Sequence, residues 1–326
     1  MNRSRSKQRL VIGAGTIGKA LARELVAEGD YVIVASRSGT SVPGATAVTV
    51  DASDATALIR VTENSDTVFL ASGPTQYHRW AELWPPVFES VIGAARWCGA
   101  DLVMLGNLYA YGEGSRMPLT ERSPLRASDS KGLVRKAGWL SALDANSLGE
   151  LRAVEVRASD YFGPGAGSTS QLGPDFFGPL IAGKTARVFG RVDQPHSWAY
   201  LPDITETLIA AADFAGQWGR AWHVPCAEPF TRQQLAARVN ALTGCEAEVA
   251  SWPTWALRAM GAVKPEVKAA NELLSQFTGP FISDASDTEA LLGVGATPWN
   301  DSLPVTVNSY RRELAGSRAK VKESQR

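Results

Sequence analysis

Three glycines near the start of the sequence, Gly13, Gly15 and Gly18, have the spacing used by phosphate-binding turns. They follow the apolar run 10–12 and precede apolar residues at helical spacing. At such a strand–helix junction the first glycine permits a tight turn and the second lets the backbone approach a pyrophosphate. The third lets the helix pack closely on the strand, and the positive end of the helix faces the phosphates. The alternative is that these glycines serve only a tight turn. The predicted dinucleotide contacts here are Gly13, Gly15, Thr16, Ile17 and Gly18.

The end of the second expected strand bears on which dinucleotide would bind. NAD sites usually carry an acidic residue about 20 residues after the glycine loop, where it bonds the ribose hydroxyls. This sequence has Ser36, Arg37 and Ser38 there instead. The guanidinium of Arg37 is a permanent cation with a planar donor fork suited to a 2′-phosphate, and both serines can add hydroxyl bonds. The segment predicts NADP(H) rather than NAD(H); the alternative is an ordinary surface arginine.

Two further segments are expected beside the cofactor. Asp51 follows the third expected strand, where its carboxylate would accept a hydrogen bond from the adenine amino group. Alternatively, it caps a turn before the helix that begins near Asp54. Ala52, next to Asp51, is a further predicted cofactor contact. After the fourth expected strand, the small residues Ala71, Ser72 and Gly73 would let the cofactor backbone pass over them.

Apolar runs alternate with segments of helical periodicity through the first half of the chain. The expected strands cover 10–12, 31–35, 47–50, 67–71, 102–105 and 151–157, and the longest expected helices cover 80–98 and 130–145. Continuous apolar strands separated by amphipathic helices are typical of a parallel sheet covered on both faces. The predicted fold class is α/β, a doubly wound parallel Rossmann sheet with a smaller C-terminal substrate-binding domain.

The composition of the chain changes after Asp160. Residues 161–190 are rich in glycine and proline and are expected to form a loop-rich cap without regular sheet elements. The nucleotide-binding domain is expected to comprise 9–160 and about 191–222, and the substrate or cap domain about 161–190 and 223–300. Flexible basic tails are expected at 1–8 and 315–326.

Charge and composition exclude several classes of protein. The 326 residues include 33 Lys+Arg and 33 Asp+Glu, so no net positive charge is available to hold nucleic acid or an anionic membrane. No apolar run is long enough to cross a bilayer. The three cysteines lie far apart, which predicts a reducing, cytoplasmic setting, and no group of residues has metal-ligand spacing. We expect a small-molecule substrate and no nucleic-acid or membrane partner.

Four later stretches resemble landmarks of one enzyme family. They are Tyr111-Gly112 with Thr120-Glu121 and Pro124, residues 156–165, residues 198–204, and His223-Val224 with Pro229-Phe230-Thr231 and Leu235-Ala236. With the glycine loop, they resemble the extended short-chain dehydrogenase/reductases, the NAD-dependent epimerase/dehydratase family, over about residues 9–313. The resemblance implies a nicotinamide cofactor at the carboxyl ends of the strands. It also implies a homodimer, because the family often pairs through the helices expected at 80–98 and 130–145.

The catalytic residues of that family are only partly matched. The family uses a tyrosine acid/base, a lysine one helical turn later that lowers the tyrosine pKa, and an upstream serine or threonine. The matching positions hold Lys131, Arg135 and Asn107, and no tyrosine lies between 112 and 160. The chain therefore resembles atypical subgroups that lack the YxxxK motif. Lys131 and Arg135 are expected on one helix face, with Lys131 as an acid, Arg135 on the ribose and Asn107 donating to a carbonyl. Alternatively, both cations are solvated and catalysis is lost.

Four more residues are predicted near the reacting atoms. Tyr109 is a substitute acid, and Tyr111 matches a family position near the substrate, although either could be a wall aromatic. Asp160 replaces an asparagine that often contacts substrate; it could bind a hydroxyl or amine, act as a base, or cap a loop. His196 is a predicted substrate contact where sugar-nucleotide enzymes of the family tend to carry an arginine, which argues against a nucleotide-sugar substrate.

These observations predict an atypical NADP(H)-dependent oxidoreductase or epimerase/dehydratase. Its substrate would be a small carbonyl or hydroxyl compound, with hydride chemistry supplied by the cofactor and orientation by the protein. The missing tyrosine keeps a second hypothesis open, a non-catalytic NADP(H) sensor or scaffold that reports cofactor state to a partner. A closed pocket beside the nicotinamide would favour the enzyme, and a filled pocket with an exposed apolar patch elsewhere would favour the sensor.

Overall fold

A seven-stranded parallel sheet forms the larger part of the molecule. A computed structural model describes residues 6–253 and 273–324, with side chains described through Gly316. The strand order is β10-β6-β5-β4-β1-β2-β3, and every neighbouring pair is parallel. The bounds are β1 (Gln8–Ile12), β2 (Tyr31–Ser36), β3 (Thr46–Thr49), β4 (Thr67–Leu70), β5 (Asp101–Asn107), β6 (Ala153–Ala158) and β10 (Arg220–His223). The chain moves outward from β1 to β3, returns to β4 and continues to the other edge, so the predicted doubly wound sheet is confirmed.

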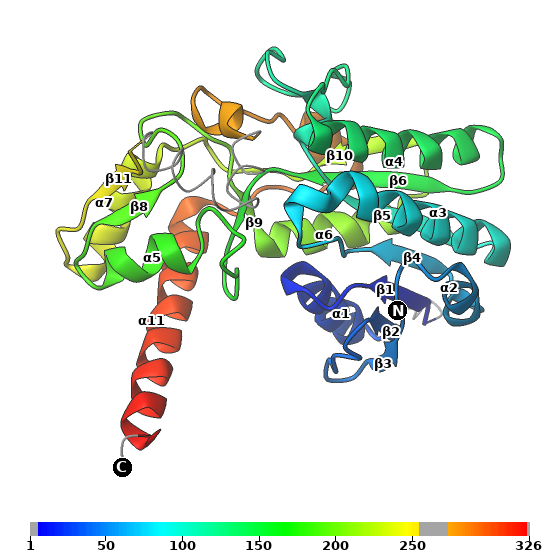
Figure 1. Ribbon diagram of the computed structural model, residues 1–326, viewed down its shortest axis with the longest axis horizontal. Helices are drawn as coiled ribbons and strands as arrows, with labels where there is room; N and C mark the ends of the chain where they lie inside the picture. Colours follow the sequence, from blue (N-terminus) through cyan, green and yellow to red (C-terminus); the bar gives the residue numbers. More distant parts are fainter. Residues whose placement is uncertain (1–5, 254–272, 325–326) are drawn as a thin grey trace.

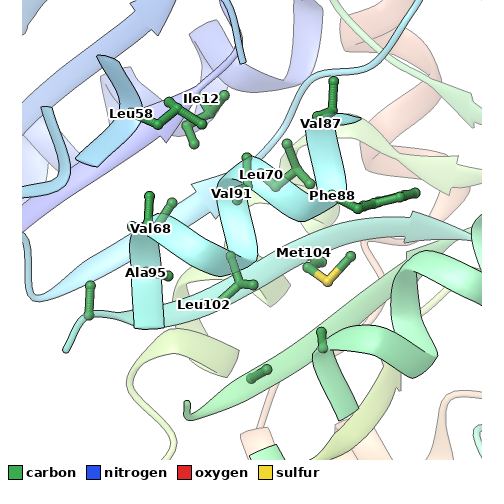
Figure 2. Packing of buried hydrophobic residues seen from close by; sticks show 14 of the residues in the cluster. Ile12, Leu58, Val68, Leu70, Val87, Phe88, Val91, Ala95, Leu102 and Met104 are labelled. Carbon is green, nitrogen blue, oxygen red and sulfur yellow. The ribbon is translucent and has the colours of Figure 1, made fainter. Parts of the chain in front are cut away.

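Helices cover both faces of this sheet (Figure 1). On one face α1 (Thr16–Glu28) packs beside α6 (Leu201–Ala212); on the other, α3 (Trp80–Cys98) lies between α2 (Ala55–Thr62) and α4 (Ser130–Ser147). Alternate residues of each strand point into separate apolar clusters, as a strand buried on both faces requires. Figure 2 shows Val87, Phe88 and Val91 of α3 packed over strand residues such as Leu70 and Met104. Burying each large side chain contributes roughly 1.5–3 kcal/mol.

A smaller part with its own apolar core lies beside the sheet. It contains β7 (Tyr161–Phe162), α5 (Pro174–Ile181), β8 (Ala186–Val188), β9 (Ala199–Tyr200), α7 (Arg232–Thr243), β11 (Val249–Ser251), the short 3-10 helix η3 (Leu274–Phe277) and α11 (Trp299–Ser324). Its core joins aromatic residues from distant segments: Phe162, Phe176, Phe177, Trp198, Trp299 and Tyr310. Another helix, α10 (Ser286–Leu292), packs against α6 and β10 of the larger part.

The expectation that 161–190 contains no regular sheet element is wrong. β7 pairs with β9, β8 pairs with β11, and α5 lies between these strands in the chain. Proline composition suggested a loop, but Pro174 occupies the first helical position of α5, where its missing N–H costs nothing. Phe176, Phe177 and Leu180 then supply the buried helix face.

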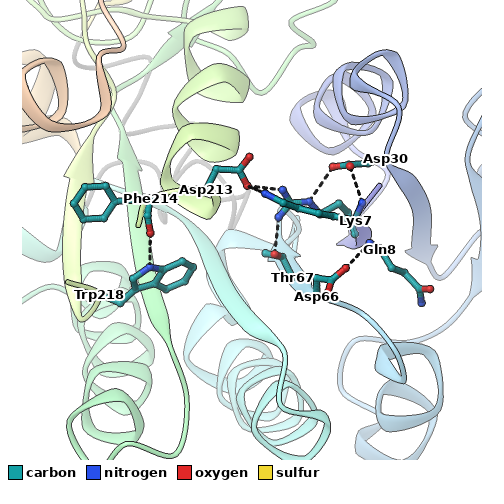
Figure 3. Close-up of polar contacts among 9 residues, drawn as sticks. Lys7, Gln8, Asp30, Asp66, Thr67, Asp213, Phe214 and Trp218 are labelled. Carbon is teal, nitrogen blue, oxygen red and sulfur yellow. Dashed lines mark hydrogen bonds and ion pairs between the residues drawn. The ribbon is translucent and has the colours of Figure 1, made fainter. Parts of the chain in front are cut away.

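The two predicted tails are also corrected where the structure describes them. α11 continues to Ser324 and points away from the rest of the molecule (Figure 1), so most of 315–326 is helical. At the other end, the Ser6 hydroxyl donates to the Gly29 carbonyl, and Lys7 bonds Asp30 and Asp213 (Figure 3). β1 begins at Gln8, and residues 1–5 of the predicted tail lie outside the described residues. In the described part of the chain, no helix combines the length and apolar character needed to span a bilayer.

Candidate active site

The glycine loop has the geometry of a phosphate cradle. The N–H of Gly13 donates to the Ala35 carbonyl at 2.8 Å, and its φ of 117° disfavours residues with a side chain. A Cβ atom at Gly13 would lie 2.4 Å from Ser72 Cβ, and one at Gly18 would lie 2.0 Å from the Gly13 carbonyl oxygen. At Gly15, by contrast, a Cβ would meet no atom within 4 Å. The outer glycines therefore serve close packing, whereas the middle one leaves open space beside the helix start.

That open space adjoins the first turn of α1. Gly15 is the N-cap residue, no side chain caps its N–H groups, and the first turn contains no acidic residue. Exposed N–H groups and the helix dipole favour an anion at this position. Thr16 and Ile17 begin the helix and are partly buried. Gly167, in the loop after β7, lies close to Thr16, since a Cβ there would be 3.9 Å from the Thr16 hydroxyl. The residues present fit a pyrophosphate, with the Gly167 loop at its side.

The predicted 2′-phosphate residues lie at the carboxyl end of β2. Arg37 is exposed, and it is close enough to Asp51 to lower the pKa of that carboxyl group. Hydrogen bonds from the Ser53 backbone and side chain lower this pKa further and more strongly. Asp51 therefore adopts the turn-capping role left open by the sequence. The Ser36 hydroxyl accepts a hydrogen bond from the Thr40 backbone N–H at 3.2 Å. The Ser38 hydroxyl lies 2.7 Å from the Thr40 hydroxyl.

The small residues over which the cofactor backbone is predicted to pass lie at the end of β4. Ala71 continues the pairing of β4 with β1, because its N–H donates to the Ile12 carbonyl. Ser72 is exposed. A Cβ at Gly73 would lie 2.3 Å from the Trp84 ring, so this glycine is required by packing. Ala52 is partly buried after β3.

Lys131 and Arg135 do share one face of α4, but that face is buried. The Asp129 carboxylate starts the helix by accepting the N–H groups of Lys131 and Gly132. The two side chains are buried, and the Arg135 guanidinium donates to the Leu105 carbonyl and stacks 4.7 Å from the Trp84 ring. Arg135 is thus held by the protein interior, which corrects its predicted role as a ribose ligand. The alternative of two solvated cations is wrong as well.

Tyr111 is not a substrate contact in this structure, which corrects the prediction. Its side chain is fully buried, and its hydroxyl accepts from Arg157 at 2.8 Å and lies 2.6 Å from His223 Nε2. Arg157 also pairs with Glu155 at 2.6 Å. Because the Arg157 guanidinium only donates, the Tyr111 hydroxyl donates to Nε2, and His223 Nδ1–H donates to the Asp284 carbonyl. Burial, followed by the charge of Arg157, lowers the pKa of His223 to about 4, so this imidazole is neutral.

Aromatic hydroxyls meet at the carboxyl ends of β4 and β5. Tyr77, in the short 3-10 helix η1 (Tyr77–Arg79), and Tyr109, in η2 (Tyr109–Tyr111), both stack on Trp80, at 4.5 and 6.1 Å. The two phenol groups interact, and burial, with Asp160 nearby, raises both pKa values. Tyr109 therefore stays protonated and can donate a hydrogen bond, but it is a poor base. Asn107 Oδ1 accepts the Tyr109 N–H at 3.1 Å, which leaves its amide nitrogen as a donor.

Asp160 follows β6 and meets His196 across the same edge. His196 Nε2 lies 2.9 Å from Asp160 Oδ2, with side-chain exposures of 4% for the histidine and 16% for the aspartate. Since His196 is buried, its predicted direct contact with substrate is corrected; it reaches the site through Asp160. Burial lowers the pKa of His196, while the contact with Asp160 acts in the opposite direction.

Two residues of this region were missed by sequence reasoning. Tyr77 follows β4, so the rule that carboxyl ends of parallel strands meet at one edge would have included it. Arg232 begins α7, and its guanidinium donates to the Phe189 and Arg191 carbonyls and lies 4.8 Å from the Phe277 ring. Burial lowers its pKa to about 10, opposed by the nearby Asp160. No local pattern around Arg232 distinguishes it from a surface cation.

Comparisons with known proteins show the family to which the chain belongs. The sequence profile described as "NAD dependent epimerase/dehydratase family" matches residues 9–224. The chain belongs to this family. No curated protein in the comparison matches the chain. Among the described residues, no group of three or more His, Cys, Asp or Glu side chains is arranged to hold a metal ion.

Solved structures of the epimerase/dehydratase type share the fold over nearly the whole chain. An epimerase from Methanothermobacter thermautotrophicus has a TM-score of 0.78 and 20% identity, covering 98% of this chain and 95% of its own. UDP-glucose 4-epimerase from Thermotoga maritima, solved with UDP-glucose, has a TM-score of 0.77 and 17% identity, covering 94% of this chain and 99% of its own. A dTDP-glucose 4,6-dehydratase from Streptomyces venezuelae, solved with NAD, has a TM-score of 0.75 and 20% identity, covering 93% of this chain and 96% of its own.

Proposed function

We propose that this member of the epimerase/dehydratase family is an NADP(H)-dependent oxidoreductase or epimerase/dehydratase. Its substrate would be a small carbonyl or hydroxyl compound, bound where Tyr77, Tyr109 and Asp160 meet at the carboxyl ends of the strands. The observation that carries the proposal is the glycine loop, with open space at Gly15 and tight packing at Gly13 and Gly18. A bound nicotinamide would donate or accept a hydride there.

The preference for NADP(H) rests on Arg37. Its exposed guanidinium follows β2, where NAD enzymes place a carboxylate, and the nearby acid Asp51 is engaged by Ser53. A cation suits a 2′-phosphate, which the ribose of NAD(H) lacks. Ser36 and Ser38 flank this position and would add hydroxyl contacts to the phosphate.

The chain's own residues supply polarisation and proton handling in this proposal. Asn107 would donate its amide N–H to a substrate oxygen, and Tyr109 would donate its phenolic O–H. Asp160 would exchange a proton with the substrate. Lys131 and Arg135 share the buried face of α4, and the permanent positive charge of Arg135 would favour negative charge on the substrate oxygen. This set replaces the Tyr–Lys–Ser machinery, as in an atypical subgroup of the family.

Nucleotide sugars are the ligands named for several similar structures, including UDP-glucose in the Thermotoga epimerase. Here the position expected to carry an arginine for the nucleotide phosphate holds His196, which is buried among aromatic rings. A buried imidazole paired with Asp160 offers no cation to such a phosphate. We therefore place small carbonyl compounds first in a substrate screen and UDP- and dTDP-sugars second.

A titration with NADPH, NADH and NADP⁺ tests the cofactor assignment. Wild type should bind NADPH at least tenfold more tightly than NADH, and Arg37→Ala should remove most of that difference, about 1.4 kcal/mol or more. Arg60→Ala is the matched control, because Arg60 is exposed in the last turn of α2. Equal affinities for NADPH and NADH in wild type would refute the NADP(H) assignment. Failure to bind any dinucleotide would remove the proposed function altogether.

The second candidate is a non-catalytic NADP(H) sensor or scaffold. It is favoured by the burial of Lys131 and Arg135, which occupy the positions matched to the family's tyrosine and lysine. A sensor would bind NADPH but would not oxidise it with any carbonyl compound, whereas the enzyme would do so. We also propose a homodimer through α3 and α4, which pack side by side and leave Trp97, Leu133 and Leu140 exposed.

A further inference from the structure

The glycine-rich segment after β7 forms a compact loop with a defined shape. Tyr161 holds it at two points: its carbonyl accepts from the Ser170 hydroxyl, and its own hydroxyl lies 3.1 Å from the Thr169 hydroxyl. The Ser170 N–H donates to the Gly167 carbonyl at 3.0 Å. A Cβ at Gly173 would lie 2.5 Å from that same carbonyl oxygen, so the two arms of the loop touch.

This loop is part of the smaller part of the molecule, because α11 anchors it there. The Tyr310 hydroxyl donates to the Ala166 carbonyl at 2.7 Å, and this contact is buried. The Tyr310 ring stacks on Phe177 of α5 at 5.1 Å, within the aromatic core of the smaller part. Any ligand that binds this loop is therefore bound by the smaller part.

The tip of the loop reaches the larger part at the proposed phosphate site. A Cβ at Gly167 would lie 3.9 Å from the Thr16 hydroxyl, in the first turn of α1. Successive Cα atoms lie about 3.8 Å apart, so Ser168 is also within reach of a group bound at this turn. The open position at Gly15, where a Cβ would meet no atom within 4 Å, comes just before Thr16. A phosphate placed there would lie beside both segments.

The loop carries hydrogen-bond donors that the protein itself leaves unused. Within the part of the chain that the structure describes, no hydrogen bond engages the backbone N–H groups of Gly167, Ser168 or Thr169. Ser168 and Thr169 are also exposed. Between Asp160 and Asp175 the chain contains no acidic residue, so no carboxylate on the loop opposes an anion. Consecutive N–H groups beside a helix N-terminus suit phosphate oxygens, which only accept hydrogen bonds.

We propose that Gly167, Ser168 and Thr169 form a second phosphate-binding segment. It holds the pyrophosphate of the dinucleotide from the smaller part, while the first turn of α1 holds it from the larger part. The assignment rests on the proposed function, because it concerns the same cofactor. The ligands are the three backbone N–H groups and the Ser168 hydroxyl. The Thr169 hydroxyl, which faces Tyr161, is a positioning group that fixes the shape of the loop.

Binding from two sides determines what this segment contributes. NAD(H) and NADP(H) share the pyrophosphate and differ at the 2′ position of the ribose, for which Arg37 is the proposed contact. The segment therefore adds affinity for both dinucleotides and selects neither. Because one ligand binds both parts of the molecule, it stabilises the arrangement in which the smaller part lies against the larger one.

Hydrogen exchange followed by mass spectrometry tests the segment directly and requires no turnover. The amides of Gly167, Ser168 and Thr169 should exchange within the first seconds of labelling in the free protein. Saturating NADPH, without substrate, should slow this exchange about tenfold or more. The turn at 215–217 is the matched control, because it precedes β10 at the opposite edge of the sheet, and its exchange should stay the same. Unchanged exchange of residues 167–169 in protein saturated with NADPH would overturn the proposal.

Two variants of the loop test its contribution to affinity. Ser168→Ala removes a hydroxyl donor and should weaken NADPH binding about three- to tenfold, with Ser147→Ala, exposed at the end of α4, as its control. Gly167→Leu should fold, because a Cβ there makes only an ordinary contact with Thr16, but its side chain should weaken NADPH binding about tenfold or more. Gly178→Leu is the control within α5, where a Cβ meets nothing within 4 Å. Circular dichroism verifies the folding of each variant.

Failure of this inference and failure of the proposed function give different results. If wild type binds NADPH while residues 167–169 stay unprotected, or if folded Gly167→Leu keeps wild-type affinity, the second segment is refuted and the glycine loop remains the phosphate site. If wild type binds no dinucleotide, the proposed function is refuted and the segment with it. Equal affinities for NADPH and NADH, with protection of the loop by both, would refute the role of Arg37 and support the segment.

Discussion

Replacing the glycines of the loop one at a time should separate packing from ligand binding. Gly15 has φ −74° and ψ −168°, a conformation open to any residue, and a Cβ there meets nothing within 4 Å. Gly15→Val should therefore change the free energy of unfolding by less than about 1 kcal/mol. Its side chain would occupy the space proposed for the pyrophosphate, so NADPH affinity should fall at least tenfold, about 1.4 kcal/mol.

Gly18→Ala should have the opposite profile. Its Cβ would lie 2.0 Å from the Gly13 carbonyl oxygen and 3.0 Å from the carbonyl carbon, both backbone atoms. The helix must move away from the loop, at a cost of about 1–3 kcal/mol in stability. Urea unfolding measures the stability of each variant, and calorimetric titration measures its NADPH affinity. The matched control is Gly93→Ala, at an exposed position of α3 where a Cβ also meets nothing within 4 Å.

The decisive comparison is between Gly15→Val and the control. Gly93→Ala should bind NADPH as wild type does and gain about 0.5–1 kcal/mol in stability, because it replaces a glycine within a helix. If Gly15→Val folds normally and also binds NADPH with unchanged affinity, the phosphates do not lie at this loop. The argument from open space at Gly15 would then be refuted.

Two further predictions concern buried charges. The pKa of His223 is lowered to about 4, so its neutral form is favoured by folding; stability should be full above about pH 6.5 and fall by up to about 3 kcal/mol as the pH drops toward 4. Urea unfolding at several pH values should show this loss in wild type and a weaker one in His223→Gln, and equal slopes would contradict it. Arg9 is buried and pairs with Asp30 and Asp213, whose side chains are 12% and 42% exposed. Asp30→Asn should therefore cost about 2–3 kcal/mol and Asp213→Asn about 1 kcal/mol, and the reverse order in thermal or urea unfolding would refute this ranking.

The sheet was predictable because its information is local. Each strand is a short apolar run, and the glycine loop marks the first turn, so strand order follows from the rules of doubly wound sheets. The smaller part was less predictable, because its elements are stabilised by distant partners. β8, for example, is only Ala186–Val188 and depends on β11, about sixty residues later in the chain.

The site was predictable as a set of residue types but not as a geometry. Asp160 was identified because it matches a family position that often contacts substrate, yet its pairing with His196 depends on ring contacts from Phe277 and Phe281, far along the chain. Tyr111 matched a family position near substrate, but Arg157 and His223 hold its hydroxyl inside the protein. Arg135 likewise faces inward because Trp84 and the Leu105 carbonyl lie beneath α4. Such partners are set by tertiary packing, which a single sequence does not reveal.

The chain leaves the seven-stranded sheet after β6 and returns to the helices that cover this sheet at α6, which begins at Leu201. Asp160 and His196 lie close to these two crossings, 36 residues apart in the chain, and their 2.9 Å contact joins the two crossing segments to each other. A rotation of the smaller part relative to the sheet would therefore have to break this contact or carry both segments with it. The pair thus stiffens the junction between the two parts of the molecule.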